Sequence, residues 1–227
     1  MRFITREQPY ETPISAGQLR YEQDGEPTGG VEHWRLTAAL EGYRVLHIDR
    51  DERFAPSGNS YLYHAFVNEN GRFERLKFRF WGSGLQVTGN VLIEDDEIVM
   101  RREVNGESFD QTLAVSGNDV AFWFPSAVAM AWAVGNGEPH VRPTAVLLQA
   151  NLSSDKPFTL EQLPITRTQD DPTTLKITGK ERQVLPTTVS WTDKSETMWI
   201  DEHGAVLMID GGKGRTAVAT RYLRYTQ

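Results

Sequence analysis

The chain has 227 residues, of which 39% are hydrophobic and 10% aromatic, and this is enough apolar material for a sizeable core. Its formal net charge of -7 argues against the broad basic surface of a nucleic-acid-binding protein. Because cysteine is absent, disulfides, thiolate metal sites, cysteine-ligated iron–sulfur clusters and a cysteine nucleophile are all excluded.

The first residues, 1–14, are polar and contain prolines, which predicts an N-terminal arm. No apolar signal sequence is visible at the start. No run of the sequence approaches the length of about 18 apolar residues that a membrane-spanning helix needs. We therefore expect a cytoplasmic protein without a transmembrane segment.

Short runs of alternating apolar and polar residues follow one another from about residue 17 to residue 115. The clearest is Phe73 to Trp81, where Phe78 and Phe80 share one face with Leu76. The opposite face carries a row of cations, Arg75, Lys77 and Arg79. This row is typical of a solvated strand face, and it could also attract an anionic lipid head group or membrane surface.

The turn Asn105-Gly106 is the strongest hairpin signal of the chain. Strand-sized runs resume at residue 144 and continue to the C-terminus at roughly ten-residue spacing. The pattern predicts a mainly β fold, a large antiparallel meander that forms an open or incomplete β-barrel.

The segment 122–137, FWFPSAVAMAWAVGNG, interrupts this pattern and is apolar on every side. Pro125 and Ser126 suit the start of a helix, and Gly135 suits its end. An apolar helix of this length must be buried or must cover something apolar. We expect it to plug or lid the barrel within a single domain of residues 1–227; the alternative is a division into two domains at the helix.

Three polar residues fall on the predicted inner face of their strands: Glu32, Arg102 and Gln111. A charged group inside a barrel must be paired or must contact a polar ligand, because leaving it alone costs several kcal/mol. One interpretation is that they bind a polar head group at the base of an apolar pocket. The other is a hydrated strand end or a structural Glu–Arg pair.

Aromatic side chains are ambiguous in the same way, since they can line a cavity or fill a core. The residues concerned are Trp34, Phe78, Phe80, Trp123 and Trp132. Together with the three polar residues they form the predicted ligand-binding set. Within it, Trp123 and Trp132 are expected to decide between a pocket and a core.

Three of the five histidines, His33, His47 and His64, lie on successive predicted strands and could cluster across the sheet. A metal site needs three converging ligands, which the alternation does not establish. There is also no nucleophile elbow, phosphate-binding loop or dinucleotide fingerprint. We therefore predict no metal, no cofactor and no catalytic residue.

Two stretches, Gly30–Leu36 (GVEHWRL) and Pro157–Arg167 (PFTLEQLPITR), resemble stretches that occur in the same order in a bacterial family described as glycolipid-binding. The matching residues are Glu32, His33 and Arg35 in the first, and Leu163, Pro164 and Ile165 in the second. The resemblance implies a fold similar to the lipoprotein carriers, an incomplete antiparallel barrel around an apolar cavity, and a glycolipid-like ligand.

These observations favour non-enzymatic binding of a hydrophobic or amphipathic molecule, lipid- or glycolipid-like, inside a β-cup. An enzyme that acts on an apolar or sugar-bearing substrate is the alternative, and it requires residues such as Glu32, His33, His47 or Arg102 to converge in one cleft. A third interpretation is a scaffold with a filled core that works through its outer surface.

Overall fold

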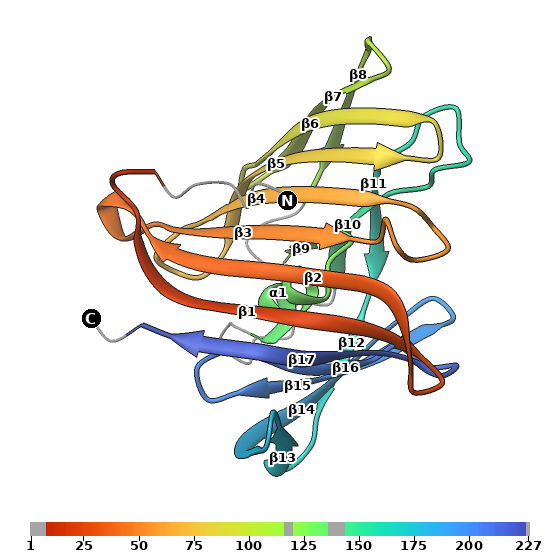
Figure 1. Ribbon diagram of the computed structural model, residues 1–227. Coiled ribbons are helices and arrows are strands. Elements are labelled where there is room, and N and C mark those ends of the chain that lie inside the picture. The colour runs from red at the N-terminus through yellow and green to blue at the C-terminus, as the bar shows by residue number, and fades with distance from the viewer. Residues whose placement is uncertain (1–7, 116–119, 136–143, 226–227) are drawn as a thin grey trace.

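The computed structural model describes residues 8–115, 120–135 and 144–225. These residues form a β-rich molecule with a single α-helix among them (Figure 1). The elements are β1 (Thr12–Gln23), β2 (Glu26–Ala38), the 3-10 turn η1 (Leu40–Gly42), β3 (Arg44–Asp51), β4 (Ser60–Val67), β5 (Phe73–Gly82), β6 (Leu85–Ile93), β7 (Glu97–Val104), β8 (Glu107–Ala114), β9 (Val120–Trp123), α1 (Ala127–Gly135), β10 (Thr144–Gln149), β11 (Thr159–Pro164), β12 (Thr166–Gln169), β13 (Thr173–Ile177), β14 (Lys180–Trp191), β15 (Lys194–Asp201), β16 (Val206–Asp210) and β17 (Arg215–Arg224).

The wall of the molecule is one 14-stranded sheet in the order β12-β14-β15-β16-β17-β1-β2-β3-β4-β5-β6-β7-β8, with β13 also paired to β14. Its strand pairs are antiparallel, and the order does not close on itself. The first and last strands, β1 and β17, are neighbours within it. The predicted fold class, a large open antiparallel barrel with one short helix, is confirmed.

A three-stranded sheet, β11-β10-β9, and helix α1 lie inside the curve of the wall (Figure 1). We call these elements, with their connections from Val120 to Pro164, the plug. The plug follows β8 in the chain and leads into β12, so it connects the two free edges of the wall. The strands β9 and β10 run parallel, which departs from the predicted purely antiparallel meander.

The predicted helix 122–137 is shorter than expected. Its first residues belong to β9, where Phe122 pairs with Val146 and Trp123 pairs with Leu147 of β10. The helix begins at Ala127 and ends at Gly135, and residues 136 and 137 lie outside the described part of the chain. The predicted arm also ends earlier, because β1 begins at Thr12.

Aromatic side chains pack between the plug and strands β4 and β5 of the wall. Phe158 of the plug packs on Phe78 and Phe80 of β5, with ring centroids 5.1 and 5.3 Å apart. Phe124 packs on Tyr63 of β4 at 4.6 Å. All five are almost completely buried, so on this side the interior is a packed core.

Turn chemistry explains how the wall strands are connected. Asn105 and Gly106 have φ values of 49° and 92°, as a two-residue hairpin turn requires, and they join β7 to β8 as predicted. β2 ends at Ala38, and Leu40 in the following turn η1 is 68% exposed. Among the described residues, no helix has the length and apolar content that a membrane span needs.

Candidate functional site: the wall–plug junction and its cavity

Glu32 lies on the inner face of β2 and is 0% exposed. Its carboxylate accepts hydrogen bonds from the Tyr21 hydroxyl at 2.6 Å and the Ser126 hydroxyl at 2.8 Å. It also accepts from the backbone N–H groups of Val128 at 3.0 Å and Ala127 at 3.3 Å. Glu32 therefore caps the first turn of α1, where free N–H groups and the helix dipole favour a negative charge.

The other two inward polar residues also bind plug backbone. Arg102 of β7 is 5% exposed and donates from Nε to the Pro157 carbonyl at 2.8 Å. Gln111 of β8 donates from Nε2 to the Leu160 carbonyl at 2.9 Å and accepts from the Leu160 N–H at 3.0 Å. This amide pairs with β11 much as a neighbouring strand would, so it anchors the plug at the free edge of the wall.

Arg50 of β3 joins the same junction from the side of the Glu32 cap. Its guanidinium lies over the rings of Tyr21 and Tyr61, 4.8 and 5.3 Å from their centroids. It donates to the Pro125 carbonyl at 3.1 Å and to Glu52 at 2.7 Å. Burial raises the pKa of Tyr21 well above its usual value, so its hydroxyl remains a donor to Glu32.

Two of the predicted aromatic residues lie flat on the wall because a glycine faces them. A Cβ atom at Gly17 would come within 2.5 Å of the Trp34 indole nitrogen, and one at Gly89 would overlap the Phe78 ring. Trp34 and Phe78, like Phe80, are buried. These three aromatic residues pack the wall, and none of them lines the cavity that remains between the wall and the plug.

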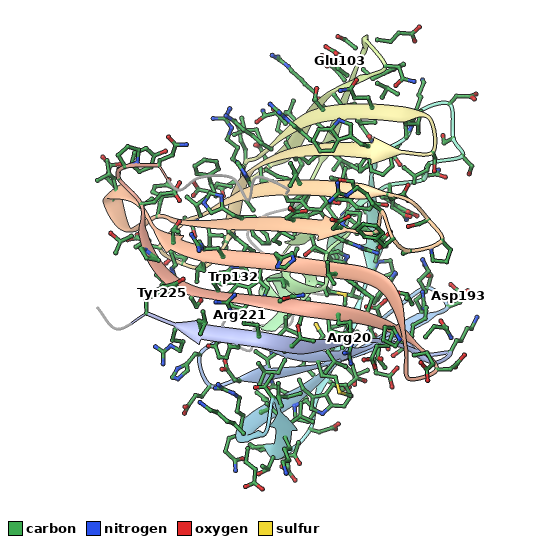
Figure 2. All side chains as sticks on the ribbon, in the orientation of Figure 1. Arg20, Glu103, Trp132, Asp193, Arg221 and Tyr225 are labelled. Carbon is green, nitrogen blue, oxygen red and sulfur yellow. The ribbon has the colours of Figure 1, made fainter. Side chains whose placement is uncertain are left out.

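Trp132 in α1 contacts the hairpin between β4 and β5. Its indole N–H donates to the Gly71 carbonyl at 3.1 Å, and the Arg44 guanidinium lies 5.7 Å from its ring centroid. The side chain lies toward the end of the molecule that holds Tyr225, whereas the turn with Asp193 marks the opposite end (Figure 2). Trp132 therefore acts as a packing residue of the plug.

A cavity of about 570 Å³ remains between the wall and the plug at the end near Asp193. Its apolar surface comes from plug residues and from the inner face of β14, β16 and β17: Trp123, Phe124, Met130, Leu147, Leu148, Trp191, Ile209 and Ala217. Trp123 and Trp191 meet edge to face, with centroids 5.7 Å apart. Small-molecule sites commonly have this size and aromatic character.

Charged side chains surround the apolar part of the cavity: Glu22, Arg50, Glu52, Lys194, Glu196 and Arg215. Burial raises the pKa of the Glu196 carboxyl, and the nearby Arg215 partly offsets that effect. An aromatic surface with both signs of charge beside it can accommodate a molecule with an apolar part and a polar part.

The eight predicted binding residues are thus divided by the structure. Trp123 lines the cavity, and Glu32 lies just behind it, bonded to the lining residues Ser126 and Ala127. The other six pack the wall or anchor the plug elsewhere, and whether any of the eight binds a ligand stays a prediction. The sequence analysis did not predict Trp191 or Glu196 as lining residues. The only signal in the sequence was that Trp191 stands next to a turn, and Glu196 had none.

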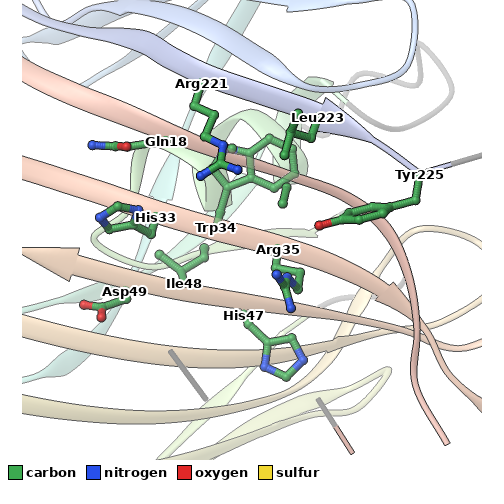
Figure 3. Close-up of a pocket in the computed structure, with 12 residues that line it drawn as sticks. Gln18, His33, Trp34, Arg35, His47, Ile48, Asp49, Arg221, Leu223 and Tyr225 are labelled. Carbon is green, nitrogen blue, oxygen red and sulfur yellow. The ribbon is translucent and has the colours of Figure 1, made fainter. Parts of the chain in front are cut away.

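The outer face of β17, β1, β2 and β3 carries a smaller pocket of about 100 Å³ (Figure 3). His33, Arg35, His47 and Arg221 are among its lining residues. Glu32 and Arg102 face the interior, so the residues required by the enzyme interpretation lie on opposite faces of the wall and do not converge. The four residues therefore do not share one cleft, although His33 and His47 line the same pocket, and the enzyme interpretation stays a prediction.

The predicted histidine cluster forms only in part. His47 and His64 meet edge to face at 4.8 Å, and the His47 Nε2 atom lies 2.8 Å from Glu11. Burial, followed by the neighbouring His47, lowers the pKa of His64 to about 4. Within the described residues, no three His, Asp or Glu side chains are placed to hold a metal ion.

Comparisons with known proteins leave the family open. No protein-family model matches the chain, and no curated protein does. Among solved structures it is similar to the hypothetical lipoprotein YmcC from Escherichia coli (K12), with 13% identity over 97% of this chain and 90% of that chain and a TM-score of 0.31. This similarity carries no functional argument, and the glycolipid-binding resemblance of Gly30–Leu36 and Pro157–Arg167 stays a prediction.

Proposed function

We propose that the chain binds one small amphipathic molecule, lipid- or glycolipid-like, in the 570 Å³ cavity between the wall and the plug. The observation that carries this proposal is the composition of the cavity. Its apolar part includes the paired indoles of Trp123 and Trp191, and charged side chains lie around it. The apolar part of the ligand lies against the indoles, and its polar part meets Arg50, Lys194 and Glu196.

Packing in the rest of the barrel favours this cavity, and not the centre of the cup, as the binding site. The centre is occupied by the plug, whose Phe158 and Phe124 pack tightly against the wall. Apolar side chains that line the cavity lack part of the stabilisation that packed side chains have. Each Å² of apolar surface removed from water contributes about 25 cal/mol to stability. A ligand that covers the lining of the cavity recovers this contribution.

Native mass spectrometry and solvent extraction of the purified protein test the proposal first, and titration with a fluorescent fatty-acid analogue gives an affinity. Leu147→Asn places an amide on the half-buried cavity surface. Leu175→Asn is the matched control, since Leu175 is a half-buried strand leucine that is not among the cavity-lining residues. We expect Leu147→Asn to weaken binding about tenfold, or ~1.4 kcal/mol, and the control to bind like the wild type.

Two results would contradict the proposal. The first is a wild-type protein that binds none of the probes and yields no extractable amphipathic molecule. The second is an equal loss of affinity in both leucine variants, because the effect would then come from general destabilisation and not from the cavity.

A further inference from the structure

The outer face of β4–β8 carries a large hollow of about 1030 Å³. It is separated from the proposed amphipathic cavity by the wall itself. Four exposed cations line it, Arg75, Lys77, Arg79 and Arg101. The chain as a whole has 31 acidic against 24 basic residues, so this concentration of positive charge opposes the overall balance.

No acidic residue lies directly opposite the cations of β5 on the two adjacent strands. On β4 they face Phe66, His64 and Leu62, and on β6 they face Leu92, Asn90 and Thr88. All six of these side chains are neutral at pH 7, His64 because of its lowered pKa. On an exposed sheet face, opposite charges on adjacent strands stabilise each other, and here that compensation is missing.

Neighbouring groups are placed to hold an anion over this row. Lys77, Asn90 and Arg101 lie side by side on β5, β6 and β7, so the two cations are about 10 Å apart across two strand spacings. Arg75 already donates from Nε to the side-chain Oδ1 atom of Asn90 at 2.9 Å, so the N–H₂ group of the same amide points away from Arg75. No hydrogen bond or ion pair of the Lys77 or Arg79 side chain is found in residues 8–115, 120–135 and 144–225.

Two carboxylates reduce the positive charge of the hollow on the side of β7 and β8. Glu103 and Asp110 also line the hollow, and Asp110 lies 4.0 Å from Arg101. Both partners of that pair are highly exposed, so the interaction is weak and readily exchanged for a stronger one. The centre of positive charge therefore lies over β5, at Lys77 and Arg79.

From this geometry we propose that the hollow binds a phosphate-bearing anion, held by Lys77 and Arg79 with Arg101 and Asn90 at its side. Lysine and arginine provide charge-assisted hydrogen bonds to phosphate oxygens, and several cations in one hollow favour an anion with more than one negative charge. A soluble phosphorylated compound and a phospholipid head group share this chemistry.

Titration calorimetry with pyrophosphate at low ionic strength tests the soluble source. Sedimentation with phosphatidylcholine vesicles, with and without phosphatidylglycerol, tests the lipid source. The double variant Lys77→Gln/Arg79→Gln removes the central cations, which are exposed and do not support the core. The control Lys176→Gln/Lys180→Gln makes the same change in net charge at exposed positions on β13 and β14.

We expect the wild type and the control to bind at least one of these anions, more weakly as salt is added, and the Lys77/Arg79 variant to bind it at least tenfold more weakly. Pyrophosphate binding alone identifies a soluble ligand, and binding to anionic vesicles alone identifies a lipid head group. A wild type that binds neither overturns the proposal. Equal weakening in both double variants also overturns it, since net charge alone would then explain the loss.

Discussion

Removal of the Glu32 carboxylate tests whether the polar residues inside the barrel hold the plug in place. In Glu32→Ala, four donors lose their acceptor: two hydroxyls and the first two free N–H groups of α1. Unsatisfied buried groups cost about 1–3 kcal/mol each, and a carboxylate at a partly buried helix start contributes up to ~2 kcal/mol. With relaxation and water entry, we expect a loss of about 3–5 kcal/mol, the range found when one partner of a buried charged interaction is removed.

Urea unfolding, followed by both tryptophan fluorescence and circular dichroism, measures this loss. Glu32→Gln retains one acceptor oxygen but turns an N–H₂ group toward donors, so we expect about 2–3 kcal/mol. Tyr21→Phe removes a single bond and should cost about 1 kcal/mol. Glu26→Ala, at an exposed position on the same strand, is the control and should stay within about 0.5 kcal/mol of the wild type.

The reasoning would be refuted by a loss below about 1 kcal/mol in Glu32→Ala, or by an equal loss in Glu26→Ala. Either result would mean that the carboxylate is not what secures the first turn of α1. If Glu32→Ala does not fold, Glu32→Gln and Tyr21→Phe still rank the interactions, because their expected losses are smaller than the total stability of a typical domain, about 5–15 kcal/mol.

Trp132→Ala should lower the free energy of unfolding by about 3–5 kcal/mol in urea titrations, because it empties a packed site and leaves the Gly71 carbonyl without its donor. Unchanged stability, together with a weaker affinity for the fluorescent fatty-acid analogue, would contradict this. His64 has a folded-state pKa of about 4, below the unfolded value of about 6.5, so wild-type stability should fall as the pH drops from 6.5 to 4. Urea titrations of His64→Gln should show a decrease smaller by about 1–3 kcal/mol; equal pH profiles would contradict the assignment.

Alternation along single strands made much of the wall predictable from the sequence. Phe78 and Phe80 are buried and Lys77 and Arg79 exposed, as the period of two required. The plug was harder to predict, because Phe122 and Trp123 form a strand only through pairing with β10. That pairing depends on residues distant in sequence, and local helix signals do not report it.

In the candidate site, too, the positions of the residues could be predicted from the sequence, but their bonding partners could not. Alternation placed Glu32, Arg102 and Gln111 inside, and the energetic argument that each needed a partner was correct. Their partners in the plug, however, are distant in sequence: the Ser126 hydroxyl is 94 residues from Glu32, and the Leu160 backbone is 49 residues from Gln111. The cavity was not predictable either, since its lining comes from strands and a helix spread from β1 to β17.

The pairing of β1 with β17 has a consequence for the order in which the protein assembles. Tyr21 of β1 lies opposite Ala217 of β17, so this part of the wall forms only when residues far apart in the sequence meet. Until β17 arrives, one edge of β1 lacks its partner and is open to pairing with other chains. Contacts of such long sequence separation slow folding, so the edge of β1 stays exposed for longer during folding. The risk of aggregation is greatest in that interval.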